Sequence, residues 1–115
     1  MTLTQPPPAI IANLEKLLNG PRDGALLRYS LGNEWLKAGN ATKAVDYLRS
    51  SLSLAPDSSA GWKQLGKALS TSGDIPAALE AYANGIRVAE GKGDIQAAKE
   101  MTVFAKRLRK LTGTD

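Results

Sequence analysis

The feature that most constrains the fold of this chain is an internal repeat with a period of 34 residues. Shifting the sequence by this period superposes identical residues, among them Leu31 on Leu65, Gly32 on Gly66, Gly39 on Gly73, Ala44 on Ala78 and Ala55 on Ala89. A fixed period of this length is the signature of repeat architectures, in which each unit buries its apolar face only against its neighbours. We therefore expect a single domain at 1–115 with two full copies, at 25–58 and 59–92.

The spacing of apolar residues within each copy is that of α-helices. In the second copy the first stripe occupies positions i, i+3, i+4 and i+7, which line one helix face: Trp62, Leu65, Gly66 and Leu69. The same positions of the first copy hold Arg28, Leu31, Gly32 and Trp35. Gly73 is placed to end the first helix of its copy, and Asp74 to cap the second. Gly39 and Asn40 repeat this arrangement, so each copy is predicted to be an antiparallel pair of helices.

The flanking segments fit the same pattern. A shift of 68 residues places 8–19 on the second helix of a pair, which predicts an N-terminal capping helix. The segment 94–112 is expected to form a C-terminal capping helix of ambiguous phase, because a shift of 34 puts Glu100 in the position of Gly66. We favour a shift of 36, which gives an uncharged stripe: Ala98, Met101, Thr102 and Ala105. The sequence thus predicts about six helices.

These residues resemble the tetratricopeptide repeat (TPR) family, whose signature is W-x2-L-G-x2-Y, then A-x3-F, then P. The matching residues are Trp62, Leu65, Gly66, Ala78 and Tyr82 in the second copy and Leu31, Gly32, Ala44 and Pro56 in the first. The departures are Arg28 for Trp, Trp35 and Leu69 for Tyr, Leu48 for Phe, and Glu90 for the closing Pro. The resemblance covers 25–92 and implies an all-α fold, a right-handed superhelix of antiparallel helix pairs, or α-solenoid.

The resemblance also implies a concave groove, formed by the first helix of each pair, that binds protein partners. Family geometry places in it Leu26, Tyr29, Asn33, Lys37, Ala60, Lys63, Lys67, Gln96, Lys99, Val103 and Lys106. The candidate partner-binding residues among them are Tyr29, Asn33, Lys37, Lys63, Lys67, Lys99 and Lys106. Because the lysines would make the groove basic, we expect an adaptor that binds an acidic partner segment, extended or helical.

One subgroup of the family binds chaperone tails through a C-terminal carboxylate, held by a clamp of two Lys, two Asn and one Arg. Of those positions only Asn33 matches in this sequence, and the others hold Tyr29, Gln64, Gln96 and Glu100. The resemblance therefore implies that chaperone C-terminal peptides of the E-E-V-D type do not bind.

The composition removes most catalytic chemistries. The sequence contains no His and no Cys, which excludes His general bases, Cys nucleophiles and the usual zinc sites. The acidic residues are scattered as caps and outward-facing positions, and no glycine-rich phosphate-binding string occurs. We therefore expect no enzymatic activity, no cofactor and no metal.

Two other partner classes stay open because the positive charge is concentrated near the C-terminus. The net charge is +4, and the segment 99–110 contributes five Lys and Arg against one Glu, also a net +4. Nucleic-acid binding through this basic helix is one alternative, with Phe104 as the only aromatic residue nearby. Self-association through Phe104, Leu108 and Leu111 is the other.

The sequence shows no basic leader followed by an apolar segment, and its apolar runs are too short to span a membrane. We expect a cytoplasmic, monomeric protein that makes no contact with membranes. Trp35 and Trp62 occupy packing-stripe positions, and we expect both in the core.

Overall fold

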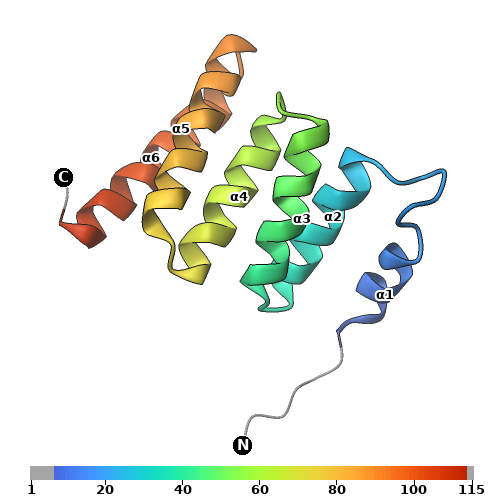
Figure 1. The fold of residues 1–115 in the computed structure, drawn as a ribbon. Helices are drawn as coiled ribbons and strands as arrows, with labels where there is room; N and C mark the ends of the chain where they lie inside the picture. Colours follow the sequence, from blue (N-terminus) through green and yellow to red (C-terminus); the bar gives the residue numbers. More distant parts are fainter. Residues whose placement is uncertain (1–6, 114–115) are drawn as a thin grey trace, which may run out of the picture.

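The computed structural model describes residues 7–113, and this part of the chain forms six α-helices and no strand (Figure 1). The helices are α1 (Ala9–Glu15), α2 (Ala25–Lys37), α3 (Ala41–Leu54), α4 (Ser59–Ser72), α5 (Ile75–Gly91) and α6 (Ile95–Thr112). The predicted all-α fold is confirmed. Figure 1 shows α2 to α6 standing side by side in chain order, with the described N- and C-terminal segments at opposite ends of the row.

The turn inside each repeat copy is set by a glycine and a capping residue. Gly39 and Gly73 have φ values of 86° and 93°, in the left-handed region that glycine adopts without a Cβ clash. The next residue, Asn40 or Asp74, accepts a hydrogen bond from the backbone N–H three residues later, at 3.0 and 3.2 Å. The predicted helix stops and caps are therefore present in both copies.

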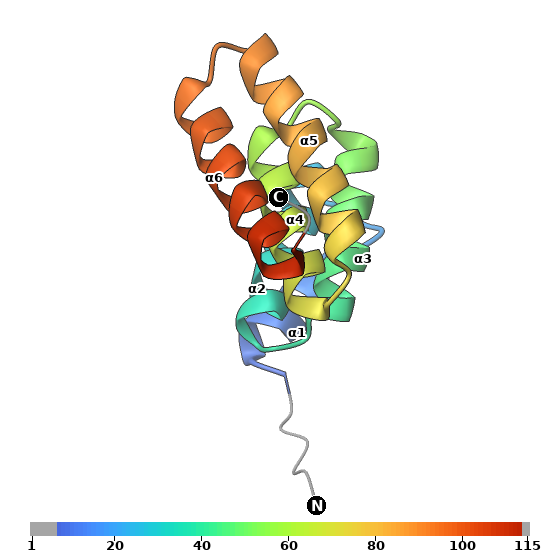
Figure 2. The ribbon, with the colours of Figure 1, turned by 90° about the vertical axis from the view of Figure 1, so that its left-hand side faces the viewer.

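The helices form two layers. Within the repeat copies α2 packs on α3 and α4 on α5, and the stack continues through contacts of α3 with α4 and of α5 with α6. The first helices also touch one another, α2 with α4 and α4 with α6, whereas α3 and α5 do not touch. Figure 2 shows α6 on one side of the molecule and α3 on the other, with α4 between them. The stack is therefore closer along α2, α4 and α6, which form its inner layer.

Glycines at equivalent positions make the closest crossings within the two pairs. A Cβ on Gly66 would lie 2.4 Å from a ring carbon of Tyr82, and a Cβ on Gly32 would lie 2.6 Å from Cγ of Leu48. Neither distance leaves room for a side chain, so glycine is what lets α4 approach α5 and α2 approach α3. The largest fully buried side chains lie along the whole stack: Ile11, Leu31, Leu48 and Met101.

The N-terminal helix is shorter than predicted. We expected a helix at 8–19, but α1 ends at Glu15. The backbone then tightens into turns of the 3₁₀ type, in which Leu17 N–H donates to Leu14 O and Leu18 N–H donates to Glu15 O. Asn19, with φ of 65°, ends this segment in the left-handed region. The short helix is still fixed to the stack, because Ile11 is fully buried and the Tyr47 hydroxyl donates to Glu15 Oε2 at 2.8 Å.

The two tryptophans differ in burial. Trp35 is buried, as expected, and the Lys43 ammonium lies 4.4 Å from its ring centroid. The expectation for Trp62 was wrong in part, because its side chain is only partly buried. Its indole Nε1 donates to the carbonyl of Pro56 at 2.8 Å, in the loop before α4. Reaching that carbonyl keeps the ring at the edge of the helix pair rather than in its centre.

The last helix buries four residues at helical spacing: Ala98, Met101, Ala105 and Leu108. Thr102, the fourth member of the predicted stripe, is exposed, since within residues 7–113 no helix follows α6 to cover it. The burial of Leu108 corrects one expectation, that Phe104, Leu108 and Leu111 form an exposed surface. Leu108 packs inward, Phe104 rests against Tyr82, and Leu111 alone is fully open, at 81% exposure.

Candidate functional site

Two adjoining hollows open on the inner layer of the stack. The α2–α4 hollow has a volume of about 250 Å³ and is lined by Asn33, Leu36, Lys37, Gln64 and Lys67. The α4–α6 hollow has a volume of about 240 Å³ and is lined by Lys63, Gln64, Lys67, Tyr82 and Phe104. Gln64 and Lys67 line both, so the hollows meet along α4 and form one groove across α2, α4 and α6.

The α2–α4 hollow is polar and is held by hydrogen bonds between the two helices. Gln64 Nε2 donates to Asn33 Oδ1 at 2.8 Å, which links the middle of α2 to the middle of α4. Lys37 lies at the end of α2, where its ammonium is 3.5 Å from Glu34. This pair is largely exposed and is therefore weak. Lys37 thus remains able to exchange Glu34 for an anionic ligand.

The α4–α6 hollow has an aromatic floor under a cationic rim. The rings of Tyr82 and Phe104 are tilted by 47° with centroids 5.9 Å apart, which is ordinary aromatic packing. Burial raises the pKa of Tyr82, so its phenol stays protonated at neutral pH and can donate a hydrogen bond. At the rim Lys63 is paired with Glu100 of α6 at 3.2 Å. Lys67 forms no ion pair with any residue of the described part of the chain.

The structure brings four of the seven candidate partner-binding residues together: Asn33, Lys37, Lys63 and Lys67 line the two hollows. Three others lie outside them. Tyr29 is partly buried against the core. Lys99 and Lys106 are exposed on α6 and do not line either hollow.

Four lining residues were not among the candidate binding residues predicted from the sequence: Leu36, Gln64, Tyr82 and Phe104. Tyr82 had been recognised as a helix-packing residue, and periodicity alone could not show that the ring also borders a hollow. The sequence also gave no signal for the Lys63–Glu100 pair, which joins residues 37 apart and depends on how α4 and α6 cross. Glu34 and Glu100 make the groove less basic than its lysines alone suggest.

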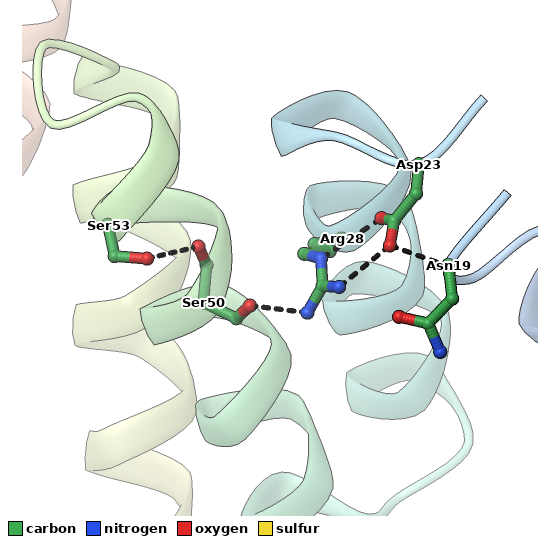
Figure 3. Close-up of polar contacts among 5 residues, drawn as sticks. All are labelled: Asn19, Asp23, Arg28, Ser50 and Ser53. Carbon is green, nitrogen blue, oxygen red and sulfur yellow. Dashed lines mark hydrogen bonds and ion pairs between the residues drawn. The ribbon is translucent and has the colours of Figure 1, made fainter. Parts of the chain in front are cut away.

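A separate polar cluster lies at the N-terminal end of the stack (Figure 3). The Arg28 guanidinium donates to both carboxylate oxygens of Asp23, at 3.0 and 2.7 Å, and to Ser50 Oγ at 2.7 Å. Asp23 also accepts a hydrogen bond from the backbone N–H of Asn19 at 2.9 Å. These contacts lower the pKa of Asp23, chiefly through the bond to Arg28. Because the Asp23 carboxylate and the Arg28 guanidinium are bonded within the cluster, its role is to fix the loop before α2.

Neither metal-binding nor membrane-spanning features stand out between residues 7 and 113. No group of three or more acidic side chains is arranged to hold a metal ion there. Nor does that part of the chain contain a helix both long and apolar enough to cross a membrane.

A row of antiparallel helix pairs with a groove along its first helices defines a helical-repeat protein. Over 99 residues the chain is 46% identical to the TPR repeat-containing protein PA0015 of Pseudomonas aeruginosa, a match that covers 86% of this chain and 94% of the relative. The chain therefore belongs to the TPR family, which confirms the resemblance seen in its sequence. No model of a known protein family matches it.

Solved structures agree with this assignment. The solution structure of protein BPP2914 from Bordetella parapertussis is 37% identical, covers 90% of each chain and superposes with a TM-score of 0.79. The TPR domain protein from Salinibacter ruber is 28% identical and has a TM-score of 0.72, over 81% of this chain and 93% of that one. The fold is thus that of a protein–protein interaction module, a class that generally lacks catalytic activity.

Proposed function

We propose that this protein is a non-enzymatic adaptor that binds an acidic segment of a partner protein in the groove of α2, α4 and α6. The observation that carries this proposal is the meeting of two hollows along α4, lined by three lysines and by no carboxylate among the described lining residues. The proposed binding residues are those predicted from the sequence: Tyr29, Asn33, Lys37, Lys63, Lys67, Lys99 and Lys106. As the sequence suggests, we expect the adaptor to be a cytoplasmic monomer.

The roles of the lysines differ with their surroundings. Lys67 has no ion pair with residues 7–113 and borders both hollows, so it is the charge most available to a ligand. Lys63 is already neutralised by Glu100, so it favours an anion only if the ligand displaces that carboxylate. Lys99 and Lys106 lie beyond the hollows on α6, where their charge would speed the approach of an acidic segment rather than hold it.

The test is a charge reversal confined to the groove. A Lys37→Glu and Lys67→Glu double variant removes the two most accessible groove cations and leaves the Lys63–Glu100 pair intact. The matched control is Arg49→Glu with Arg87→Glu, which changes the net charge equally at exposed positions of α3 and α5. Random dodecapeptides displayed on phage provide the ligands, and isothermal calorimetry measures the affinity of those selected by the wild-type protein.

We expect the selected peptides to be acidic and their affinity to fall with added salt. The groove variant should lose at least about tenfold in affinity, while the control loses less than threefold and both keep the wild-type melting temperature. Equal binding by the wild-type protein and the folded groove variant would overturn the proposal. A peptide ending in Glu-Glu-Val-Asp should not bind, because Tyr29, Gln64, Gln96 and Glu100 stand in the clamp positions.

Nucleic-acid binding through α6 is the alternative, and the exposure of Lys99, Lys106, Arg107 and Lys110 is the observation that favours it. A generic duplex DNA, titrated at increasing salt, would then bind the groove variant as well as it binds the wild-type protein. An Arg107→Glu and Lys110→Glu variant would in turn lose DNA and keep the acidic peptides. The two functions are therefore separable with the same set of proteins.

A further inference from the structure

The hydroxyl of Tyr82 is a polar group without a partner in the groove. Tyr82 is only 3% exposed, and its hydroxyl forms no hydrogen bond with any residue of 7–113. Tyr47 shows the usual arrangement, because its hydroxyl donates to Glu15 at 2.8 Å. Because polar groups of buried side chains are mostly hydrogen-bonded within the protein, the Tyr82 hydroxyl stands out as a donor left available to water or to a ligand.

The Tyr82 side chain borders the α4–α6 hollow, and its hydroxyl is not fully sealed from solvent. Among the described side chains, Trp35 Nε1 is the one polar atom that is both sealed from solvent and unpartnered, so the Tyr82 hydroxyl is not sealed. Tyr82 lines that hollow. Its ring is held on one side by the backbone at Gly66 and on another by Phe104, so the phenol cannot turn away without disturbing the helix crossing. A rigidly held hydrogen-bond donor therefore belongs to a side chain that lines the hollow.

The other groups around the hollow limit what it can bind. Gln64 Nε2 already donates one hydrogen bond to Asn33 Oδ1 and Lys63 is paired with Glu100, so Lys67 is the lining ammonium without an ion-pair partner among residues 7–113. Phe104 adds an apolar wall. A suitable ligand must therefore accept a hydrogen bond, carry a negative charge and have a short apolar stem that fits a hollow of about 240 Å³.

We propose that the α4–α6 hollow is a subsite for one glutamate side chain of the partner. The carboxylate accepts a hydrogen bond from the Tyr82 hydroxyl and pairs with Lys67, and the two methylenes pack on Phe104. Aspartate is a poorer ligand because its stem has one methylene fewer to pack on Phe104. This inference rests on the proposed function, since it names the side chain by which an acidic segment is read.

The test is a mutant cycle between Tyr82→Phe and the peptide. The probe is the tightest peptide from the phage selection whose binding depends on Lys37 and Lys67, and each of its glutamates is changed in turn to Gln and to Asp. One glutamate should cost about tenfold in affinity when it becomes Gln on the wild-type protein, and less than threefold on Tyr82→Phe. Tyr82→Phe should keep or raise the melting temperature, because it removes a hydroxyl that has no hydrogen-bond partner among the described residues.

Tyr47→Phe is the matched control. It removes a hydroxyl that is hydrogen-bonded within the protein and lies outside both hollows, so it should lower the melting temperature and leave peptide affinity unchanged. If groove-dependent acidic peptides are found but no glutamate responds differently on Tyr82→Phe, the subsite is overturned and the proposed function stands. If no selected peptide depends on the groove lysines, the proposed function is overturned, and the subsite with it.

Discussion

The two repeat copies use different chemistry at the same position. In the second copy the Cβ of Trp62 packs against Gly85 of α5, and the Trp62 indole donates a hydrogen bond to Pro56 O in the loop before α4. Arg28 of the first copy reaches across to α3, where it donates to Ser50, and it also binds Asp23 in the loop before α2. The position therefore requires a long, flat side chain that joins the helix pair to its preceding loop. An indole and a guanidinium both meet that requirement, but only the guanidinium does so through an ion pair, the one between Arg28 and Asp23.

The copies differ again where the paired helices cross. In the first copy Gly32 faces Leu48, an aliphatic side chain that simply fills the crossing. In the second copy Gly66 faces Tyr82, whose ring fills the same space and whose hydroxyl has no partner in the described chain. Only in the second copy, therefore, does the side chain at the helix crossing also line a hollow and carry a hydrogen-bond donor. The first copy lines the groove through α2 alone, with Asn33, Leu36 and Lys37, whereas the second copy adds Tyr82 from its helix crossing.

The largest effect should come from removing α6, because the second copy depends on it and the first does not. A chain that ends at Glu90 uncovers the α5 face that packs on Met101 and Phe104. Terminal repeats need such a cap, so we expect aggregation or loss of a cooperative melting transition. Circular dichroism and light scattering would measure this, with a chain ending at Thr112 as the control. A soluble fragment 1–90 that melts cooperatively would contradict the assignment of α6 as a cap.

The next largest effect should come from filling the glycine crossings. Gly66→Leu forces a side chain into the Tyr82 ring and should cost about 3 kcal/mol or more in the free energy of unfolding. Gly32→Leu meets the side chain of Leu48, which can change rotamer more easily than a ring held by Phe104, so it should cost less. Urea denaturation of the two variants would measure the difference. Equal losses would show that the crossings are equally rigid.

The regular part of this fold could be predicted from the sequence, because helices and turns depend on local spacing. Gly73 and Asp74 stop one helix and begin the next through contacts within a few residues, and the sequence shows both. The early end of α1 could not be predicted, since it depends on turns after Glu15 that a repeat shift does not encode.

The groove was predictable only in part. Lys63 and Lys67 were placed correctly on the inner layer, because a helix face follows from periodicity. The floor of Tyr82 and Phe104 and the pairing of Lys63 with Glu100 depend on how α4, α5 and α6 cross in space. A one-dimensional pattern fixes which residues share a face but not which residues of another helix lie opposite them.

A smaller effect is expected from Trp62→Ala. The ring is partly exposed, so we expect a loss of about 2–3 kcal/mol in the free energy of unfolding, below the value for a fully buried tryptophan. The loss combines the packing against α5 with the hydrogen bond to Pro56. Trp62→Phe, which keeps the packing and removes the donor, separates the two parts in chemical denaturation. A loss under about 1 kcal/mol for Trp62→Ala would show that this position is not required for the repeat.

The smallest effect, and the one that tests the charge difference between the copies, is the pH dependence of Asp23→Asn. Arg28 and the backbone of Asn19 hold the pKa of Asp23 below its usual value of about 3.8. A carboxyl with a lowered pKa in the folded state adds stability that is present above its unfolded pKa and is lost as the pH falls through its folded pKa. The melting temperature of the wild-type protein should therefore exceed that of Asp23→Asn at pH 7, and this difference should narrow below about pH 4 and close at lower pH.

Asp57→Asn is the matched control, since Asp57 occupies the equivalent position of the second copy, where Trp62 replaces Arg28. The Asp57 carboxylate is exposed and forms no hydrogen bond with residues 7–113. Differential scanning calorimetry from pH 2.5 to pH 7 should give a pH-dependent difference for Asp23→Asn alone, and a constant difference would mean that the Arg28 bridge does not stabilise the first copy.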